Sequence, residues 1–195
     1  MHSDDGDLAP LNVAPPHHLD ARQGALRLRR ATAADASFVV DLMTHIEIER
    51  FLAAVSPSTL EELSEEIRLS VERPAYHGRL VAEVEESTWE PVGSIAYAVA
   101  NRRSRIAYLS ALAIEPGRGG RGLGASVARL AIEYLVSAVG YHRVQCEIYG
   151  FNERALAVAR KAGFVEEGRR RRAYWRHGEW VDGVLFGALA DEFPS

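Results

Sequence analysis

The sequence predicts an α+β fold built on a mixed, mostly antiparallel sheet of about seven strands, flanked by about four helices. Apolar runs of strand length and apolar residues at helical spacing occur in the order β-α-α-β-β-β-α-β-α-β-β. Turn-forming residues join several neighbouring strands directly, which is typical of antiparallel hairpins. Between residues 106 and 149, by contrast, a helix separates two strands, and this crossover places one parallel pair in the sheet.

In the first half of the chain, each predicted element has a local signal. Residues 25–30 alternate apolar and basic side chains, which indicates a strand, and Thr32 is placed to cap a helix at residues 33–43. Ser58 or Thr59 starts a second helix, predicted to run to about residue 71, and acidic residues fill its first turn. Apolar runs separated by turn residues then predict three strands, at residues 79–85, 92–100 and 106–114.

In the second half, glycines mark where the helices end. Apolar residues at helical spacing predict a helix at residues 123–139 that stops at Gly140, and a shorter one at 152–162 that stops at Gly163. The remaining apolar runs predict a strand at residues 142–149 and a final pair of strands within residues 164–186 that turns at residues 176–179.

Length and composition indicate a single domain. The chain has 195 residues, of which 47% are hydrophobic and 26% charged, and this is enough for one full core. Residues 1–24 are rich in proline, histidine and acidic side chains and show no apolar period, so we expect a disordered or loosely docked tail there. The folded domain is then expected at residues 25–195.

Charge, cysteine content and histidine spacing limit the partners, the compartment and the metal sites that we expect. The net charge of -4 gives no overall attraction for nucleic acid or an anionic membrane, and arginines 169–172 are better explained as a solvated strand face or an acidic substrate groove. The one cysteine, Cys146, cannot form an internal disulfide, and no segment resembles a signal peptide or a membrane span. We therefore expect a cytoplasmic protein without a membrane partner. The histidines lack the spacing of a metal site, so no metal is expected.

The segment with the strongest functional signal is the glycine-rich stretch at residues 115–124. It follows the apolar strand at residues 106–114 and leads into an amphipathic helix. The start of a helix leaves backbone N–H groups unpaired and carries about half a positive elementary charge. Glycines let a ligand approach those groups, so the segment predicts a site for the phosphate or pyrophosphate of a nucleotide-like cofactor.

Two well-known glycine patterns overlap this stretch. Residues 117–122 fit the G-x-G-x-x-G pattern of dinucleotide-binding folds, but residues 115–116 separate them from the strand and antiparallel hairpins precede them. The stretch also matches the first part of the phosphate-binding loop of nucleotide triphosphatases. Leu123 and Gly124, however, stand where that loop needs Lys and Ser or Thr. Neither pattern is favoured here.

The stretch instead resembles the acetyl-CoA loop of the GCN5-related N-acetyltransferases, the GNAT family. That loop reads Gln/Arg-x-x-Gly-x-Gly/Ala and follows a strand that ends in Val/Ile-x-Pro. Residues 114–116 read Ile-Glu-Pro and residues 121–124 read Arg-Gly-Leu-Gly, which match the approach and the core of the loop. The usual Gln or Arg falls on Gly119, so its contact is absent or comes from Arg118 or Arg121.

Later segments extend the resemblance over about residues 25–190. Asn152 and Ala155 match the family's Asn-x-x-Ala segment, and residues 163–164 match the Gly-Phe that begins its next strand. Residues 167–186 look like the branch that acetylates the α-amines of ribosomal proteins, and also like polyamine and small-amine relatives. The resemblance implies the GNAT fold and an N-acetyltransferase domain at residues 25–195.

The resemblance also implies a reaction. Acetyl-CoA would donate its acetyl group directly to a primary amine, on a protein N-terminus, a polyamine or another small molecule, and a homodimer is one option for assembly. The alternative is a non-catalytic acyl-CoA-binding regulatory module, because Gly119 departs from the loop pattern and Ala159 stands where many relatives have a tyrosine that protonates the CoA thiolate. The residues that the resemblance assigns to cofactor binding are Leu112, Ala113, Ile114, Gly119, Gly120, Arg121, Gly122, Leu123, Gly124, Asn152 and Ala155.

Deprotonation of the amine needs a base or a chain of waters. Strand parity can turn Tyr108 and Ser110 of one strand, and Glu147 and Tyr149 of the next, towards the cleft between them. These four residues are the catalytic candidates. Cys146 argues little for a covalent route, because a lone cysteine on an apolar strand usually serves packing.

Overall fold

The computed structural model describes residues 11–12, 18–23, 25–52, 59–119 and 122–193. No helix in these ranges is long and apolar enough to cross a membrane. The strands are β1 (His18–Gln23), β2 (Leu26–Arg30), β3 (His77–Glu85), β4 (Trp89–Asn101), β5 (Ile106–Ile114), β6 (Arg143–Tyr149), β7 (Val165–Arg176) and β8 (Glu179–Leu189). The α-helices are α1 (Ala36–Thr44), α2 (Ile46–Glu49), α3 (Leu60–Glu72), α4 (Leu123–Glu133) and α5 (Glu153–Ala162). A π-helical turn at Tyr134–Val139 prolongs α4, and two short 3₁₀ turns lie at Ala33–Asp35 and Ala190–Glu192.

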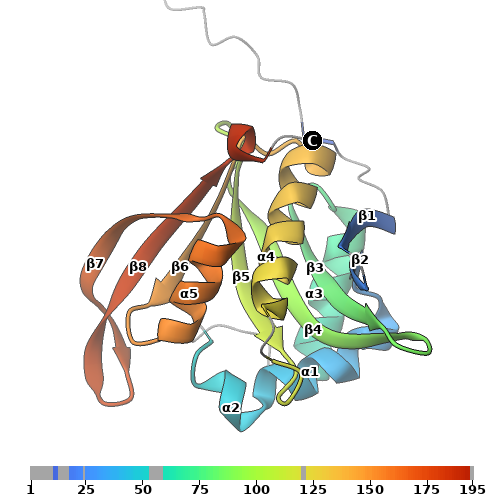
Figure 1. Cartoon of the computed structure of the whole chain (residues 1–195), viewed down its shortest axis with the longest axis horizontal. Coiled ribbons are helices and arrows are strands. Elements are labelled where there is room, and N and C mark those ends of the chain that lie inside the picture. The colour runs from blue at the N-terminus through green and yellow to red at the C-terminus, as the bar shows by residue number, and fades with distance from the viewer. Residues whose placement is uncertain (1–10, 13–17, 24, 53–58, 120–121, 194–195) are drawn as a thin grey trace, which may run out of the picture.

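The strands of the described residues form one eight-stranded sheet in the order β1-β2-β3-β4-β5-β6-β8-β7. All neighbouring strands pair antiparallel except β5 and β6, which pair parallel across the crossover through α4. The predicted α+β class with a mixed, mostly antiparallel sheet is confirmed (Figure 1).

An apolar core lies on each face of the sheet. Figure 1 shows α4 and α5 in front of the strands, and their core contains Val127 and Leu156. The other face carries α1 and α3, whose core contains Val39 and Leu63. Burial of one such side chain contributes roughly 1.5–3 kcal/mol, so packing against the sheet, more than helix propensity, fixes where these helices lie.

Side-chain caps explain where the first two predicted helices begin. The carboxylate of Asp35 accepts hydrogen bonds from the backbone N–H and the hydroxyl of Thr32, at 2.7 and 2.8 Å. Thr59 and Glu62 exchange a reciprocal pair at 3.2 Å each, which caps α3. Each arrangement pairs backbone donors that a helix start leaves free. The predicted cap at Thr32, and the Thr59 option for the second helix, are thereby confirmed.

Two elements of the structure were not predicted from the sequence. β1 lies within residues 1–24, where we predicted a tail, and pairs antiparallel with β2, which brings the sheet to eight strands rather than about seven. The four-residue α2 follows α1 after the single residue His45. Neither segment is long enough, or regular enough in apolar spacing, to give a periodic signal.

The feature that positions the site is a gap in the sheet. β5 and β6 pair only through residues 106–108 and 143–145, and the two strands then diverge (Figure 1). From Leu109 to Ile114, β5 pairs with β4 alone among the described strands, so the backbone groups on its other edge have no partner in these strands. The cleft that we expected between these two strands is therefore present.

Candidate active site

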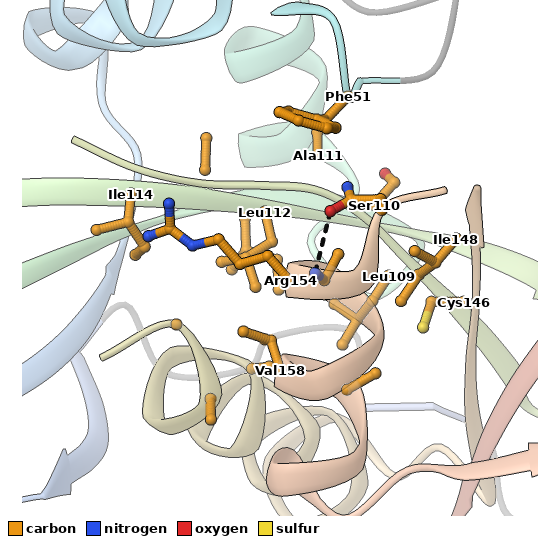
Figure 2. Close-up of a pocket in the computed structure, with 18 of the residues that line it drawn as sticks. Phe51, Leu109, Ser110, Ala111, Leu112, Ile114, Cys146, Ile148, Arg154 and Val158 are labelled. Carbon is orange, nitrogen blue, oxygen red and sulfur yellow. Dashed lines mark hydrogen bonds between the residues drawn. The ribbon is translucent and has the colours of Figure 1, made fainter. Parts of the chain in front are cut away.

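The gap between β5 and β6 opens into a cavity of about 540 Å³, a size within the usual range for small-molecule sites. Its walls come from both faces of the sheet. Leu112, Val158 and Ile148 line it on the side of α4 and α5, whereas Phe51 lies on the opposite side of β5, next to Ala111 (Figure 2). A molecule held on one face can therefore meet a molecule on the other through the gap.

A bulge in β5 shapes the wall of the cavity that this strand forms. Ala113 pairs with Ser94 and Ser110 pairs with Ala96, so two residues of β5, Ala111 and Leu112, stand opposite one residue of β4. Ala111 has a φ of 51°, a left-handed conformation that costs a non-glycine residue roughly 1–2 kcal/mol. The bulge turns Ala111 and Leu112 to opposite sides of the strand, and it lies at the mouth of the gap (Figure 2).

The glycine turn leads directly into α4. Gly122 is the N-cap residue with a φ of 81°, a conformation that glycine adopts without strain. A Cβ on Gly124 would lie 3.5 Å from Val158 of α5, so the two helices approach closely at the cavity edge. Gly119, Gly122, Leu123 and Gly124 all line the cavity. The predicted residues Gly120 and Arg121 lie outside the described ranges.

The start of α5 forms the floor. The side-chain oxygen of Asn152 accepts a hydrogen bond of 3.1 Å from the backbone N–H of Ala155 and caps the helix. Its amide NH₂ makes no hydrogen bond within the described residues and is free to donate to a ligand. Both Asn152 and Ala155 line the cavity.

Glu147 places a buried carboxylate at the gap. Its side chain is 10% exposed, and the nearest guanidinium, of Arg170, is 3.4 Å from Oε2. Oε1 is buried and has no hydrogen-bond partner among the described residues. Gly183 on β8 leaves room for this carboxylate, because a Cβ there would overlap Oε1. A buried oxygen that lacks a partner is costly, and such groups are found where function requires them.

Two tyrosines next to Glu147 remain protonated. Burial, with the charge of Glu147 as a second cause, raises the pKa of Tyr108 to about 12. Burial also raises the pKa of Tyr174, and hydrogen bonding to Glu147 contributes. Both phenols are therefore proton donors, not bases, at neutral pH.

Aromatic side chains surround the opening on the Glu147 side. Tyr149 stacks on Phe151 with ring centroids 5.5 Å apart, and contacts Tyr174 edge-on at 5.2 Å. Phe51 lies 6.1 Å from Phe151. Arg176 at the end of β7 donates to the backbone oxygens of residues 50 and 52, at 3.2 and 3.3 Å, and so ties the β7–β8 hairpin to the segment after α2.

Comparison with known proteins identifies the family. A family model described as the acetyltransferase (GNAT) domain matches residues 25–165. The chain belongs to the GNAT acetyltransferase family. Over 79 residues it is 29% identical to an uncharacterized N-acetyltransferase, YokL, derived from the SPbeta prophage of Bacillus subtilis (strain 168). That match covers 40% of this chain and 44% of the relative, so the chain spans less than half the length of this relative.

Solved GNAT structures show the same fold. Spermidine N-acetyltransferase from Vibrio cholerae, in complex with CoA and spermine, superposes with a TM-score of 0.76 at 20% identity and covers 88% of this chain and 99% of that one. Ribosomal-protein-S5-alanine acetyltransferase from Vibrio fischeri gives a TM-score of 0.74 at 16% identity, with 89% and 98% covered.

The structure brings the predicted GNAT site residues together. All four catalytic candidates, Tyr108, Ser110, Glu147 and Tyr149, line the cavity. So do the cofactor candidates that fall within the described ranges, namely Leu112, Ala113, Ile114, Gly119, Gly122, Leu123, Gly124, Asn152 and Ala155. Sequence reasoning missed Arg154 and Tyr174. Arg154 sits inside the Asn-x-x-Ala segment, which is the only signal that could have found it.

Cys146 and Ala159 also line the cavity of this GNAT protein. Burial raises the pKa of the Cys146 thiol to about 12, so it is almost entirely protonated at neutral pH and is a poor nucleophile. Ala159 is 3% exposed and carries no group that could protonate a leaving thiolate.

Proposed function

We propose that this protein transfers the acetyl group of acetyl-CoA directly to a primary amine. The observation that carries the proposal is the gap between β5 and β6, because it joins a cavity wall of small residues and free amides on one face to a buried carboxylate and aromatic rings on the other. Donor and acceptor can then meet without a covalent enzyme intermediate. The protonated state of Cys146 also favours direct transfer.

The donor side suits acetyl-CoA. In this proposal, N–H groups on the edge of β5 that β6 leaves unpaired bind the pantetheine and the oxyanion that forms at the thioester carbonyl, an effect typically worth about 3 kcal/mol in such sites. The amides of the glycine turn and the start of α4 suit the diphosphate. The solved relative that contains CoA has the same fold and supports this assignment.

The acceptor side suits an amine. Glu147 is the base in this proposal, because Oε1 has no hydrogen-bond partner in the described part of the chain and can accept a proton from an ammonium group. Aromatic faces such as those of Tyr149 and Phe151 attract cations. The solved relatives are named for spermidine and for a ribosomal-protein alanine, so a polyamine and a protein N-terminus are the two acceptor classes to test first.

A panel assay tests the proposal. Purified protein is incubated with acetyl-CoA and with polyamines, alanine-initiated peptides or small amines, and release of free CoA thiol is measured. We expect amine-dependent release with at least one acceptor. CoA binding without transfer to any amine would contradict the proposal and favour the non-catalytic acyl-CoA-binding module.

The Glu147→Gln substitution tests the base. It keeps the shape of the side chain but removes its basicity, so kcat should fall about 100-fold or more, with little change in acetyl-CoA affinity. Glu133→Gln is the matched control, because Glu133 lies at the far end of α4 and pairs with Arg129 at 2.9 Å. Equal kcat values for Glu147→Gln and wild type would remove Glu147 from the mechanism.

A further inference from the structure

At Gly119 the glycine turn has no side chain, and a side chain from α5 occupies the space. The family's loop carries a Gln or Arg at the position of Gly119, and this chain has no side chain there. A Cβ on Gly119 would overlap Nη2 of Arg154, so the guanidinium of Arg154 packs directly on the backbone of Gly119. Figure 2 shows the Arg154 side chain extended from the start of α5 towards Ile114 at the end of β5.

The position of Arg154 is unfavourable for α5 itself. It lies in the first turn of the helix, where the helix dipole repels a positive charge. Arg154 forms no ion pair with any carboxylate in the described part of the chain. Arg160 on the same helix, by contrast, pairs with Glu166 at 2.7 Å. An exposed, unpaired cation at a helix N-terminus adds little to stability, and a ligand would account for it.

Arg154 also lies where two cavities meet. It lines the main cavity of about 540 Å³ and an adjoining one of about 390 Å³, whose walls include Pro116, Gly117 and Gly119. The carboxylates of Glu47 and Glu115 line the second cavity too, but Glu115 pairs with Arg118 at 3.7 Å. An anion bound beside the backbone of Gly119 would thus be flanked by the guanidinium of Arg154.

We propose that Arg154 is the cation that binds the diphosphate of CoA, in place of the side chain that Gly119 lacks. This inference rests on the proposed function. The guanidinium reaches the turn from α5, so the contact depends on the packing of α5 against the turn and on the absence of a side chain at Gly119. Two forked N–H donors suit a diphosphate oxygen pair better than a single ammonium group would.

The first test compares ligands that differ in their phosphates. Wild type, Arg154→Gln and the control Arg160→Gln are titrated by calorimetry with CoA, 3′-dephospho-CoA and pantetheine. Arg154→Gln should weaken CoA and dephospho-CoA by the same factor, roughly 10- to 100-fold, and leave pantetheine unchanged. Arg160→Gln should match wild type.

Three other results would overturn the inference, each for a different reason. A loss with CoA but not with dephospho-CoA would assign Arg154 to the 3′-phosphate. Unchanged affinities in Arg154→Gln would assign it no ligand. If wild type itself binds no CoA, the proposed function fails and the inference fails with it, so the two failures are distinguishable.

A second test moves the charge back to the loop. Removal of the guanidinium in Arg154→Ala frees the space beside Gly119, and a second substitution, Gly119→Arg, then restores a cation at the usual family position. The double variant should recover most of the lost CoA affinity, whereas Gly119→Arg alone should not improve on wild type because Arg154 occupies the space.

In turnover, Arg154→Ala should raise the KM for acetyl-CoA with kcat within about twofold, since binding of a remote phosphate is uniform through the reaction. A thermal melt of each variant confirms that it is folded, and absence of rescue in a folded double variant would contradict the proposal.

Discussion

At the scale of single residues, the site depends on side chains that are absent as much as on those present. Gly183 leaves the space that the Glu147 carboxylate occupies, and Gly119 leaves the space that Arg154 occupies. In both cases a residue from another element fills the space with a charged group. A glycine on a strand or turn can therefore indicate a functional contact that local sequence does not name.

Gly183→Ala tests the placement of Glu147 without changing Glu147 itself. The added Cβ would overlap Oε1 of Glu147 and lie 2.8 Å from the ring of Tyr174, so the carboxylate must move. A displaced base should lower kcat about tenfold or more while acetyl-CoA binding stays unchanged. Gly168→Ala on β7 is the control, because a Cβ there meets no atom within 4 Å. If both variants turn over acetyl-CoA at the wild-type rate, the position of Glu147 is irrelevant to catalysis.

At the scale of elements, α3 is held to the sheet by a buried charge as well as by its apolar face. The guanidinium of Arg79 on β3 is 1% exposed, donates to Glu66 of α3 at 2.5 and 3.1 Å, and reaches Ser94 on β4 at 3.1 Å. Loss of the carboxylate would leave a buried charge with one neutral partner.

Glu66→Ala should therefore lower the free energy of unfolding by about 2 to 4 kcal/mol, as measured by urea denaturation. The neighbouring Glu65→Ala is the matched control. Glu65 pairs with Arg68 at 2.6 Å on the solvent side of the same helix, and exposed pairs contribute little. Equal losses for the two variants would show that the contact between α3 and β3 does not depend on the buried pair.

Elements with a strong local signal could be predicted, and those without one could not. The Thr32 and Thr59 caps, the stops at Gly140 and Gly163 and the crossover from β5 to β6 follow from local residues, and all are present. β1, with the sequence HLDARQ, is a strand because β2 offers it a free edge, which no local pattern reveals. α2 is a single turn whose following segment is tied to the β7–β8 hairpin by long-range hydrogen bonds.

The candidate site divides in the same way. The glycine turn and Asn152 could be predicted because their chemistry needs particular residues at fixed spacing in one segment. Glu147, Tyr108, Ser110 and Tyr149 could be named from strand parity. The contacts of Arg154, Phe51 and Tyr174 with the cavity arise only when α5, the segment after α2 and β7 pack around the gap, so tertiary structure was needed to find them.

At the scale of the whole molecule, a buried thiol and a buried phenol make the free energy of unfolding depend on pH in the alkaline range. The pKa of Cys146 is raised from 9.0 to about 12 and that of Tyr108 from 10.0 to about 12 by burial. Above pH 9 the unfolded chain loses these protons first and binds fewer protons than the folded one. The free energy of unfolding should therefore fall as pH rises from about 9 to about 12.

Denaturation of wild type and Cys146→Ala at a series of pH values checks this prediction. The variant lacks one of the groups whose pKa is raised, so its free energy of unfolding should fall less steeply above pH 9. Below pH 9 the two curves should run parallel. Curves that stay parallel up to pH 11 would contradict the assigned pKa of the thiol.

The central claim is that acetyl-CoA binds in the gap between β5 and β6. Calorimetric titration of the purified, folded chain with CoA tests this claim most directly. We expect saturable binding at one site with a dissociation constant between about 1 μM and 1 mM, the usual range of enzyme substrates. Absence of any binding heat at millimolar CoA would contradict the account.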